Sequence, residues 1–227
     1  MNGVREIAIY DMDRTITRTG TYTPFLIHAA LARAPWRLLL LPVALLAMLG
    51  YLCKLFTRAR LKEINQHLLL GPHVARAELE PVTASFAERV MQLNTLPGAL
   101  KQIEADRAAG RRLVLATASY RLYVEAIAER LRFDDVIATN SILGIDARVT
   151  AKIDGENCYG PAKLRMIEAW FKAEGIDRAK VRVRFYSDHA SDAPVMEWAD
   201  EAFATNPSTK MRKMANQRGW PILDWGF

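Results

Sequence analysis

The chain has 227 residues, of which 51% are hydrophobic, and its formal net charge at pH 7 is +6. This length suits one core domain with an insertion, and the apolar content excludes an intrinsically disordered chain. Between Arg14 and Ala75 eight residues are basic and only Glu63 is acidic, so this segment carries +7 and the rest about −1. Such a localised excess argues against a protein that coats nucleic acid with a uniformly basic surface.

The two cysteines and the amino-terminal residues bear on the cellular location. Cys53 and Cys158 lack the spacing of metal ligands and lie in different contexts, so we expect two reduced thiols. The amino-terminal residues run directly into an apolar segment with the character of a strand, which predicts that no signal peptide is present. The sequence therefore predicts a cytoplasmic protein.

The order of the predicted elements indicates an α/β protein. The apolar run 4–10 is typical of a buried parallel strand, and residues 22–94 have mostly helical patterns. Strands and helices then alternate, which implies right-handed β-α-β units in a parallel sheet. The predicted strands cover 112–117, 135–139, 181–186 and 201–204, with a short β excursion in 142–160. The predicted helices of this part cover 96–110, 122–131, 163–174, 193–199 and 210–217.

Two carboxylates follow the first predicted strand. Asp11 and Asp13 are spaced i and i+2, so we expect both at the carboxyl edge of the sheet, where open α/β folds bind their ligands. Two negative charges held so close repel each other and favour a cation, and hard oxygen ligands favour Mg²⁺. One carboxylate can then attack phosphorus while its neighbour transfers protons. The pair predicts Mg²⁺-dependent phosphoryl chemistry.

Three further segments extend this pattern in the same order along the chain. They are Thr117 at the end of a strand, Lys163 in Gly160-Pro161-Ala162-Lys163 at the start of a helix, and Ser187-Asp188-His189-Ala190-Ser191-Asp192 after a strand. With Asp11-Met12-Asp13-Arg14-Thr15, these segments resemble the four motifs of the haloacid dehalogenase (HAD) superfamily, whose first motif is D-x-D-x-T. The cap and the motif spacing resemble subfamily IB, which includes phosphoserine phosphatases and the bacterial phosphatidylglycerophosphatase C type.

This resemblance implies a fold and a domain organisation. The fold would be α/β, a Rossmann-like HAD core with a parallel sheet and a mostly helical cap inserted after the first strand. The core would comprise residues 1–21 and 95–227, and the cap residues 22–94. Caps in this superfamily usually select the substrate, whereas the core fixes the chemistry.

The resemblance also implies a role for each motif residue. Asp11 would attack the phosphate monoester to give an aspartyl-phosphate, and Asp13 would protonate the leaving oxygen and then activate water. Thr117 and Lys163 would bind the phosphoryl group. The residues implied for the Mg²⁺ site are Asp11, Asp13 through its backbone carbonyl, Asp188 and Asp192.

Several positions leave two interpretations open. Asp192 would bind the metal through water or would hold Lys163. Arg14 stands where the family commonly has a small residue, and it would contact substrate phosphate or pair with a surface acid. Arg18 is a further candidate for substrate contact. His189 stands where the fourth motif often has glycine, and we expect it to shape the loop.

An uncharged apolar segment, residues 38–53, lies inside the predicted cap. As a helix it would be about 24 Å long, shorter than the roughly 30 Å hydrocarbon core of a bilayer. A single crossing would also separate Asp11 from Thr117, which is incompatible with one active site. Because basic residues flank the segment, we expect peripheral or monotopic contact with an anionic membrane surface, on its inner face. The alternative is a buried cap helix or a dimer contact.

The basic, apolar cap favours a membrane lipid phosphate as the substrate, and the resemblance implies phosphatidylglycerol phosphate as the leading candidate. Residues 15–23 contain no carboxylate, which disfavours phosphoserine, because phosphoserine phosphatases bind the substrate amine with one there. The alternatives are a soluble phosphatase for a small phosphorylated metabolite and a catalytically silent binding protein on a HAD scaffold. The sequence predicts no nucleic-acid partner and leaves the leaving group and the oligomeric state open.

Overall fold

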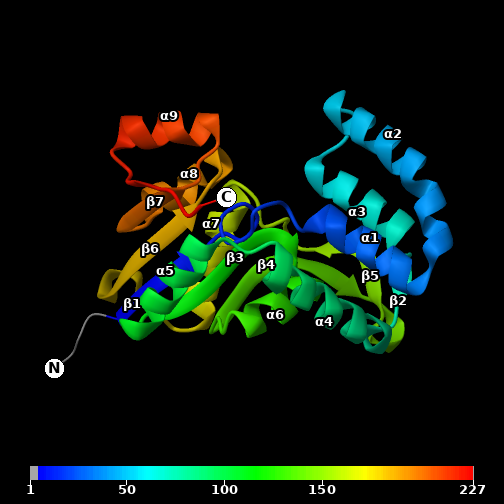
Figure 1. Ribbon diagram of the computed structural model, residues 1–227, viewed down its shortest axis with the longest axis horizontal. Helices are drawn as coiled ribbons and strands as arrows, with labels where there is room; N and C mark the ends of the chain where they lie inside the picture. Colours follow the sequence, from blue (N-terminus) through cyan, green and yellow to red (C-terminus); the bar gives the residue numbers. More distant parts are fainter. Residues whose placement is uncertain (1–4, 227) are drawn as a thin grey trace.

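The computed structural model describes residues 5–226, which form an eight-stranded sheet in the order β2-β5-β4-β3-β1-β6-β7-β8 (Figure 1). The six strands from β4 to β8 in this order are parallel, whereas β5 and β2 extend one edge in antiparallel pairing. The strands are β1 (Arg5–Tyr10), β2 (His73–Val74), β3 (Arg112–Tyr120), β4 (Asp135–Leu143), β5 (Val149–Asp154), β6 (Val181–Ser187), β7 (Glu201–Thr205) and β8 (Ile222–Leu223).

Helices cover both faces of the sheet and fill the insertion after β1. The predicted α/β architecture with a helical insertion after the first strand is therefore confirmed. The helices are α1 (Tyr22–Arg33), α2 (Leu41–Leu52), α3 (Arg58–Leu69), α4 (Arg76–Leu93), α5 (Pro97–Ala108), α6 (Arg121–Arg130), α7 (Pro161–Ala173), α8 (Ala193–Trp198) and α9 (Thr209–Arg218), with 3₁₀ turns η1 (Pro35–Leu40), η2 (Ile145–Ala147), η3 (Arg178–Lys180) and η4 (Ala190–Asp192).

The side chains of β1 alternate between two hydrophobic clusters, one on each face of the sheet. Ala8 and Tyr10 belong to the cluster that includes residues of α1, α4, α5 and α6, and Ile9 belongs to the cluster with α7, α8 and α9. Tyr10 stacks on Tyr186 of the neighbouring strand with ring centroids 4.4 Å apart. Because β1 is buried on both faces, it gives a rigid base to the residues that follow it.

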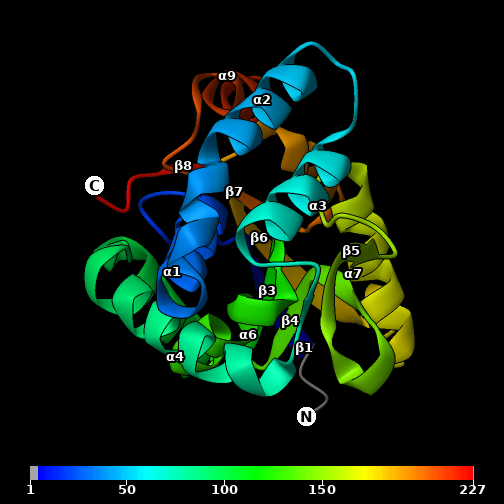
Figure 2. The same ribbon diagram turned by 90° about the vertical axis from the view of Figure 1, so that its right-hand side faces the viewer.

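The insertion has two parts with different positions. Helices α1, α2 and α3 rise beside the carboxyl edge of the sheet, and α2 packs on α3 (Figures 1 and 2). Helix α4 instead packs on α6, along the core. The predicted division between cap and core at residues 22–94 stays a prediction.

The edge strand β2 was not predicted from the sequence. The sequence predicts mostly helix over residues 22–94, whereas Val74 pairs with Val149 of β5 and α4 begins two residues later, at Arg76. Val74 is also buried in the hydrophobic cluster, but a strand of two residues is too short to leave a periodic pattern in the sequence. It attaches the insertion to the antiparallel edge of the sheet.

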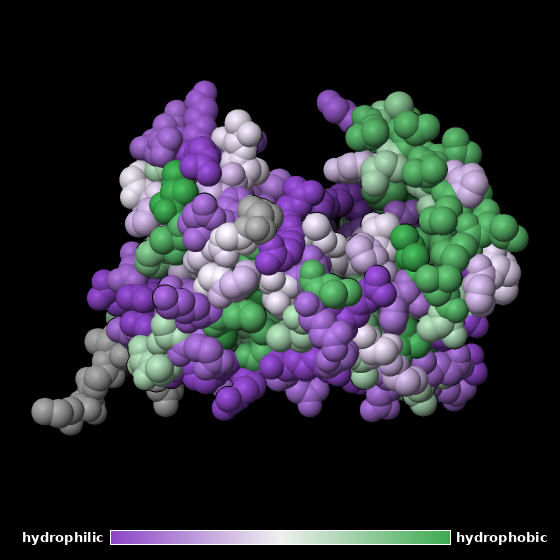
Figure 3. All heavy atoms as spheres, in the orientation of Figure 1, coloured by the Kyte–Doolittle hydropathy of each residue, from purple (hydrophilic) through white to green (hydrophobic). Residues whose placement is uncertain are grey.

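Helix α2 has no buried residue. The stretch Pro35–Leu52 is, within residues 5–226, the one helical stretch long and apolar enough to cross a membrane, and only 6% of it is buried. The interpretation of residues 38–53 as a buried cap helix is therefore wrong for this chain by itself. We define the α2 apolar surface as the exposed side chains of Trp36, Leu39, Val43, Leu45, Leu46, Met48, Leu49, Leu52 and Leu55. Figure 3 shows it as a hydrophobic area beside a hollow in the molecule.

Candidate active site

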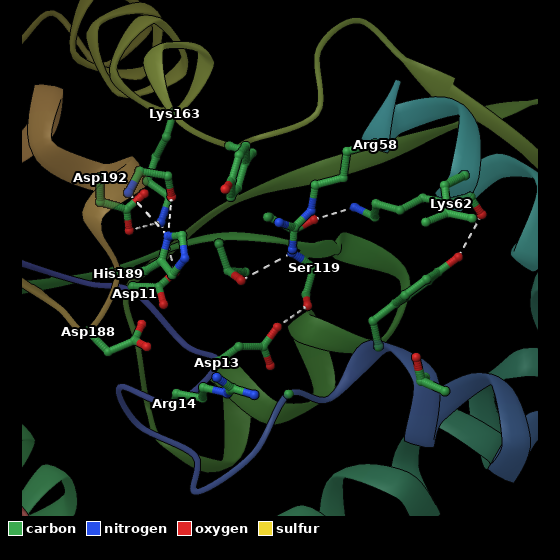
Figure 4. Close-up of a pocket in the computed structure, with 18 of the residues that line it drawn as sticks. Asp11, Asp13, Arg14, Arg58, Lys62, Ser119, Lys163, Asp188, His189 and Asp192 are labelled. Carbon is green, nitrogen blue, oxygen red and sulfur yellow. Dashed lines mark hydrogen bonds and ion pairs between the residues drawn. The ribbon is translucent and has the colours of Figure 1, made fainter. Parts of the chain in front are cut away.

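The predicted motif residues converge on one cavity at the carboxyl edge of the parallel strands. Asp11 follows β1, Thr117 lies near the end of β3 and Asp188 follows β6. Lys163 lies in the first turn of α7 and points into the same cavity (Figure 4). The cavity has a volume of about 520 Å³. The predicted residues that line it are Asp11, Asp13, Arg14, Thr117, Lys163, Asp188 and Asp192.

Lys163 joins two motif carboxylates in the buried base of the cavity. Its Nζ lies 2.8 Å from Asp11 Oδ1 and 2.6 Å from Asp192 Oδ2, and only 2% of its side chain is exposed. Burial alone would lower the pKa of Lys163, but Asp11 and Asp192 raise it above its usual value, so the ammonium is charged. Ser187 donates to Asp192 at 2.8 Å. Of the two interpretations of Asp192, the structure favours the one in which it holds Lys163.

Asp188 is a buried carboxylate without a partner. Among the described residues, no hydrogen bond or ion pair reaches its carboxylate, although the residue is only 4% exposed. Burial, followed by the charges of Asp11 and Asp192, raises the pKa of Asp188 to about 8. Burial also raises the pKa of Asp11 to about 7, with Lys163 acting in the opposite direction. Asp11, Asp188 and Asp192 are three buried carboxylates, and the Lys163 ammonium contacts Asp11 and Asp192, so negative charge is left for a divalent cation to offset.

The donor set fits Mg²⁺ through two carboxylates. No three His, Cys, Asp or Glu side chains within residues 5–226 are grouped as metal ligands. Asp11 and Asp188 would therefore hold the metal with the backbone carbonyl of Asp13 that the family resemblance implies. Magnesium commonly binds through one or two carboxylates and keeps several waters, so this set is sufficient.

Thr15 connects the loops that follow β1 and β6. Its Oγ1 accepts the backbone amide of Asp188 at 3.1 Å and donates to Asp11 Oδ2 at 3.4 Å. The threonine of the first motif thus ties the backbone of Asp188 to the carboxylate of Asp11. This role of Thr15 was not predicted from the sequence.

The carboxylate of Asp13 accepts hydrogen bonds on both oxygens. Thr21 donates its amide and its hydroxyl to Oδ1, and Ser119 donates its hydroxyl to Oδ2 at 2.8 Å. The hydroxyls of Tyr123 and Thr21 lie 2.9 Å apart. These contacts turn the Asp13 side chain across the cavity from Lys163 (Figure 4). Thr21, Ser119 and Tyr123 were not predicted as site residues.

A register shift in β3 aims its carboxyl end at the cavity. Thr117 pairs with Ala138, but Tyr120 pairs with the very next residue, Thr139. Such irregularities redirect side chains next to active sites. Thr117 is buried, and its Oγ1 accepts the amide of Ser119 at 3.1 Å. Both side chains therefore line the cavity.

The remaining predicted residues differ in position. Arg14 lines the cavity in a left-handed backbone conformation, with φ 64°, and within the described chain it pairs with no acid. Arg18 does not line the cavity, so the structure gives no support to its predicted substrate contact. His189 accepts the amide of Ser191 at 3.1 Å and caps η4, which agrees with its expected role in shaping the loop.

The insertion supplies the wall that faces the motif residues. Met48 and Tyr51 of α2 and Arg58, Lys62 and Asn65 of α3 line the cavity. Lys62 Nζ donates to Ala118 O at 2.5 Å and to Asn157 Oδ1 at 2.8 Å, which ties α3 to the end of β3. Burial and the nearby Arg58 lower the pKa of Lys62 to about 7.

The fold, the order of the motifs and the buried contact of Lys163 with Asp11 together define a HAD-type hydrolase. The family described as haloacid dehalogenase-like hydrolase matches residues 8–197, so the chain belongs to this family. The predicted family and fold class are confirmed.

Relatives by sequence match part of the chain. The "inhibition of morphological differentiation protein" of Streptomyces azureus is 38% identical over 123 residues, which are 54% of this chain and 43% of that protein. Phosphoserine phosphatase SerB1 of Mycobacterium tuberculosis is 30% identical over 126 residues, which are 56% of this chain and 39% of that protein. The chain thus spans less than half the length of these two relatives.

Solved structures match nearly the whole chain. A protein of unknown function from Bordetella pertussis Tohama I has a TM-score of 0.89 at 25% identity, and the match covers 99% of this chain and 100% of the other. A phosphoserine phosphatase, solved as a phospho-aspartyl intermediate analogue, has a TM-score of 0.64 at 16% identity over 99% and 95% of the two chains. The Bordetella protein therefore shares the insertion as well as the core.

Proposed function

We propose that this chain is a Mg²⁺-dependent phosphomonoester hydrolase that acts through an aspartyl-phosphate on Asp11. One observation carries the proposal. Lys163 holds one oxygen of Asp11 at 2.8 Å, while the partnerless carboxylate of Asp188 lies close enough to perturb its charge. The Lys163 ammonium, together with the Mg²⁺ that Asp11 and Asp188 would hold, lowers the repulsion between a carboxylate nucleophile and a phosphate dianion. The phosphoserine phosphatase whose fold this chain shares was solved as a phospho-aspartyl intermediate analogue, which supports the same route.

In the first half-reaction, Asp11 attacks phosphorus and the ester bond breaks. Lys163 occupies Oδ1, so Oδ2 forms the new bond to phosphorus. Asp13 donates a proton to the leaving oxygen as the phosphorus–oxygen bond breaks, so the leaving group departs as an alcohol. Thr117 and nearby backbone amides hold the non-bridging oxygens.

In the second half-reaction, water replaces Asp11. Asp13 is now ionised and takes a proton from water, which attacks phosphorus and releases phosphate from the Asp11 carboxylate. Asp11 and Asp188 would hold Mg²⁺, which would supply positive charge to offset the phosphoryl oxygens. Both side chains are regenerated, because the proton that Asp13 lost in the first half-reaction returns in the second.

The test is Mg²⁺-dependent phosphate release from 4-nitrophenyl phosphate by the wild type, Asp11→Asn and Asp177→Asn. Asp177 lies beside η3 on the surface and serves as a matched control. We expect Asp11→Asn to lose at least about 10³-fold in kcat and the control to lose nothing. Acid quenching should capture phosphorylated protein from the wild type alone. Full activity of folded Asp11→Asn, or no turnover by the wild type, would overturn the proposal.

For the substrate, we infer a small phosphomonoester in preference to the lipid phosphate favoured by the sequence. The likeness to phosphoserine phosphatases in sequence and fold supports this alternative. A cavity of about 520 Å³ between the motif residues and α3 also suits a small ester.

A second candidate, action at a membrane surface, rests on the α2 apolar surface. Nine large apolar side chains exposed together are unusual for a soluble protein and favour an apolar partner. Basic residues flank them, and Met48 belongs both to this surface and to the cavity lining. The cavity would thus open beside an anionic bilayer, where α2 would lie in the interface.

Vesicle flotation distinguishes a soluble phosphatase from one that docks on a membrane. Membrane docking predicts flotation with vesicles of phosphatidylglycerol and weaker flotation with phosphatidylcholine alone. The double variant Leu45→Glu, Leu49→Glu should abolish flotation. Lys101→Glu on α5, far from the α2 apolar surface, should not. No flotation by the wild type would favour a soluble phosphatase.

A further inference from the structure

Helix α9 carries a cluster of basic side chains that have no acidic partners. We define the α9 basic cluster as the exposed side chains of Lys210, Arg212 and Lys213. Met211 and Ala215, one turn apart, are buried on the face that packs on the core. Within residues 5–226 the one ion pair of α9 joins its fourth basic residue, Arg218, to Glu197. Residues 206–223 contain four basic residues and no acid, so the segment carries +4 and favours an anionic partner.

The α9 basic cluster and the α2 apolar surface lie at the same end of the molecule. Helices α9 and α2 are both at the top in Figures 1 and 2, which differ only by a rotation about the vertical axis. Figure 3 shows hydrophilic residues over α9, hydrophobic residues over α2 and a hollow between them. Lys54, in the turn between α2 and α3, is also exposed. One end of the molecule thus combines exposed apolar side chains with positive charge.

The active-site cavity lies between these two surfaces. Met48 and Tyr51 of α2 line it, and so does His189 in the loop before η4. Helix α9 packs on η4, and the amide of its N-cap residue, Ser208, donates to the carbonyl of Asp188 at 3.0 Å. A flat surface that contacted both α2 and α9 would therefore lie across the cavity.

An anionic bilayer matches both surfaces, whereas other partners match only one. Apolar side chains exposed beside basic residues favour insertion into the interface of a bilayer, and lysine and arginine bind its anionic headgroups. A nucleic acid would contact the α9 basic cluster but would leave the α2 apolar surface against water. A second copy of this chain could cover the α2 apolar surface, but its net charge of +6 brings no anionic partner to α9.

We propose that α9 is a second membrane contact, in which Lys210, Arg212 and Lys213 bind the headgroups of the same anionic bilayer that receives the α2 apolar surface. The two contacts together turn the active-site cavity toward the bilayer. Each basic residue near an anionic surface strengthens binding about 5-fold, so the three contribute about 100-fold. This inference rests on the second candidate of the proposed function, docking at a membrane, and adds the orientation of the docked protein.

Partitioning onto vesicles that contain phosphatidylglycerol tests the contribution of α9. The α9 variant replaces all three residues of the α9 basic cluster by glutamine, which keeps a good helix former at each position. The control variant removes three exposed positive charges from α4, α5 and α7 by Arg89→Gln, Lys101→Gln and Lys172→Gln. We expect the partition coefficient to fall about 100-fold in the α9 variant and less than about 3-fold in the control. Equal coefficients for the two variants would overturn the role of α9.

Lipid composition and ionic strength show whether the contribution of α9 is electrostatic. On vesicles of phosphatidylcholine alone, the wild type and the α9 variant should partition alike, because this lipid has no net charge. In 1 M NaCl the difference between the two proteins on anionic vesicles should shrink to less than about 3-fold, because salt screens exposed charges. A difference that persisted on neutral vesicles would contradict binding of headgroups by charge.

A fluorescent label on α9 tests the orientation of the docked protein. Cys53→Ser removes the exposed natural thiol, and Cys158 is buried. In that background, Asn216→Cys places one label on the exposed side of α9, and Glu129→Cys places one on α6 as a control. Lipids that carry a quencher at the headgroup should quench the label on α9 and leave the label on α6 bright. Equal quenching of the two labels in vesicle-bound protein would overturn the proposed orientation.

These outcomes separate the role of α9 from the proposed function. Among the described residues that line the cavity, none belongs to the α9 basic cluster, so the α9 variant should hydrolyse 4-nitrophenyl phosphate at the wild-type rate. If the wild type binds vesicles and the α9 variant binds them equally well, only the role of α9 is overturned. If the wild type binds no anionic vesicle, membrane docking is overturned as well, but the hydrolytic activity is not. Binding of a single-stranded oligonucleotide that required the cluster, without vesicle binding, would assign α9 to nucleic acid instead.

Discussion

Thr21 donates both its backbone amide and its hydroxyl to Oδ1 of Asp13, at 2.8 and 2.7 Å. Thr21 is also the residue immediately before α1, where the insertion begins. The other oxygen of Asp13 is held by Ser119, two residues after Thr117. The proposed acid and base is thus oriented jointly by the start of the insertion and by the strand that carries the second motif.

Replacing Thr21 by valine should slow the step that needs a proton donor. Valine keeps the volume and the amide but removes the hydroxyl that bonds Asp13. We expect kcat for glycerol 3-phosphate to fall about 10- to 100-fold, because a hydrogen bond to a charged group contributes about 1.5–3 kcal/mol. The nitrophenolate leaving group departs without a proton, so kcat for 4-nitrophenyl phosphate should fall much less. Steady-state kinetics on both esters measures this difference.

Thr21→Ser is the matched control for that prediction. Serine restores the hydroxyl, so the difference between the two esters should return to its wild-type value. An equal fall for both esters in Thr21→Val would mean that the substitution perturbs the site as a whole instead of the proton donor.

Much of this site could be predicted because its chemistry ties residues to strand ends. Asp11, Thr117 and Asp188 each follow or close an apolar run, and parallel strands bring such positions to one edge. The position of Lys163 could be predicted because it follows a glycine and a proline that mark the start of a helix. The order of strands and helices could also be predicted, because apolar runs of strand length alternate with segments of helical periodicity.

The groups that orient these residues could not be predicted from the sequence in the same way. Ser119 reaches Asp13 because of the register shift in β3. Tyr123 of α6 contacts Thr21, which bonds Asp13, only once α6 has folded back onto the sheet. The spacing of Arg58, Lys62 and Asn65 was visible, but α3 has other faces, and only the packing decides which one meets the cavity. The strand β2 is only two residues long, so its pairing with β5 left no periodic pattern in the sequence.

Removing the charge of Asp188 should separate metal binding from folding. Asp188→Asn deletes a buried carboxylate that has no partner within residues 5–226, so without Mg²⁺ the variant should be at least as thermostable as the wild type. Mg²⁺ should raise the Tm of the wild type, because a concentration of 100 times Kd adds about 2.7 kcal/mol to the free energy of unfolding. It should have little effect on the Tm of the variant. Thermal unfolding in EDTA and in Mg²⁺ measures both effects. An equal Mg²⁺ shift in both proteins would place the metal elsewhere.

Lys62 should make the free energy of unfolding depend on pH above neutrality. Burial lowers the pKa of Lys62 from 10.5 to about 7 in the folded state. Between these values the unfolded chain binds the proton and the folded chain does not, so stability should rise as pH rises from 7 towards 10.5. The slope from one such group is at most about 1.4 kcal/mol per pH unit. The groups that face Lys62 are Arg58, Asp13, Cys158, Tyr22 and Tyr120.

Urea unfolding of the wild type and of Lys62→Met at pH 7, 8 and 9 isolates this contribution. The difference between the two proteins should shift in favour of the wild type as pH rises, because methionine does not titrate. Lys152→Met, at an exposed lysine of β5, gives the control and should show a constant difference. A constant difference for Lys62→Met would mean that Ala118 and Asn157 hold the ammonium charged throughout this range.

The α2 apolar surface predicts an unusual response to polar substitutions. Leu45 and Leu46 are 67% and 65% exposed, so Leu45→Gln and Leu46→Gln should each change the free energy of unfolding by less than about 0.5 kcal/mol. Leu26 of α1 is 1% exposed, and Leu26→Ala should cost about 2–5 kcal/mol because it leaves a cavity. Urea titration at two protein concentrations measures these costs. A larger and concentration-dependent cost at Leu45 would contradict exposure in solution. Since a second copy would then cover α2, that result would favour the dimer contact over the membrane.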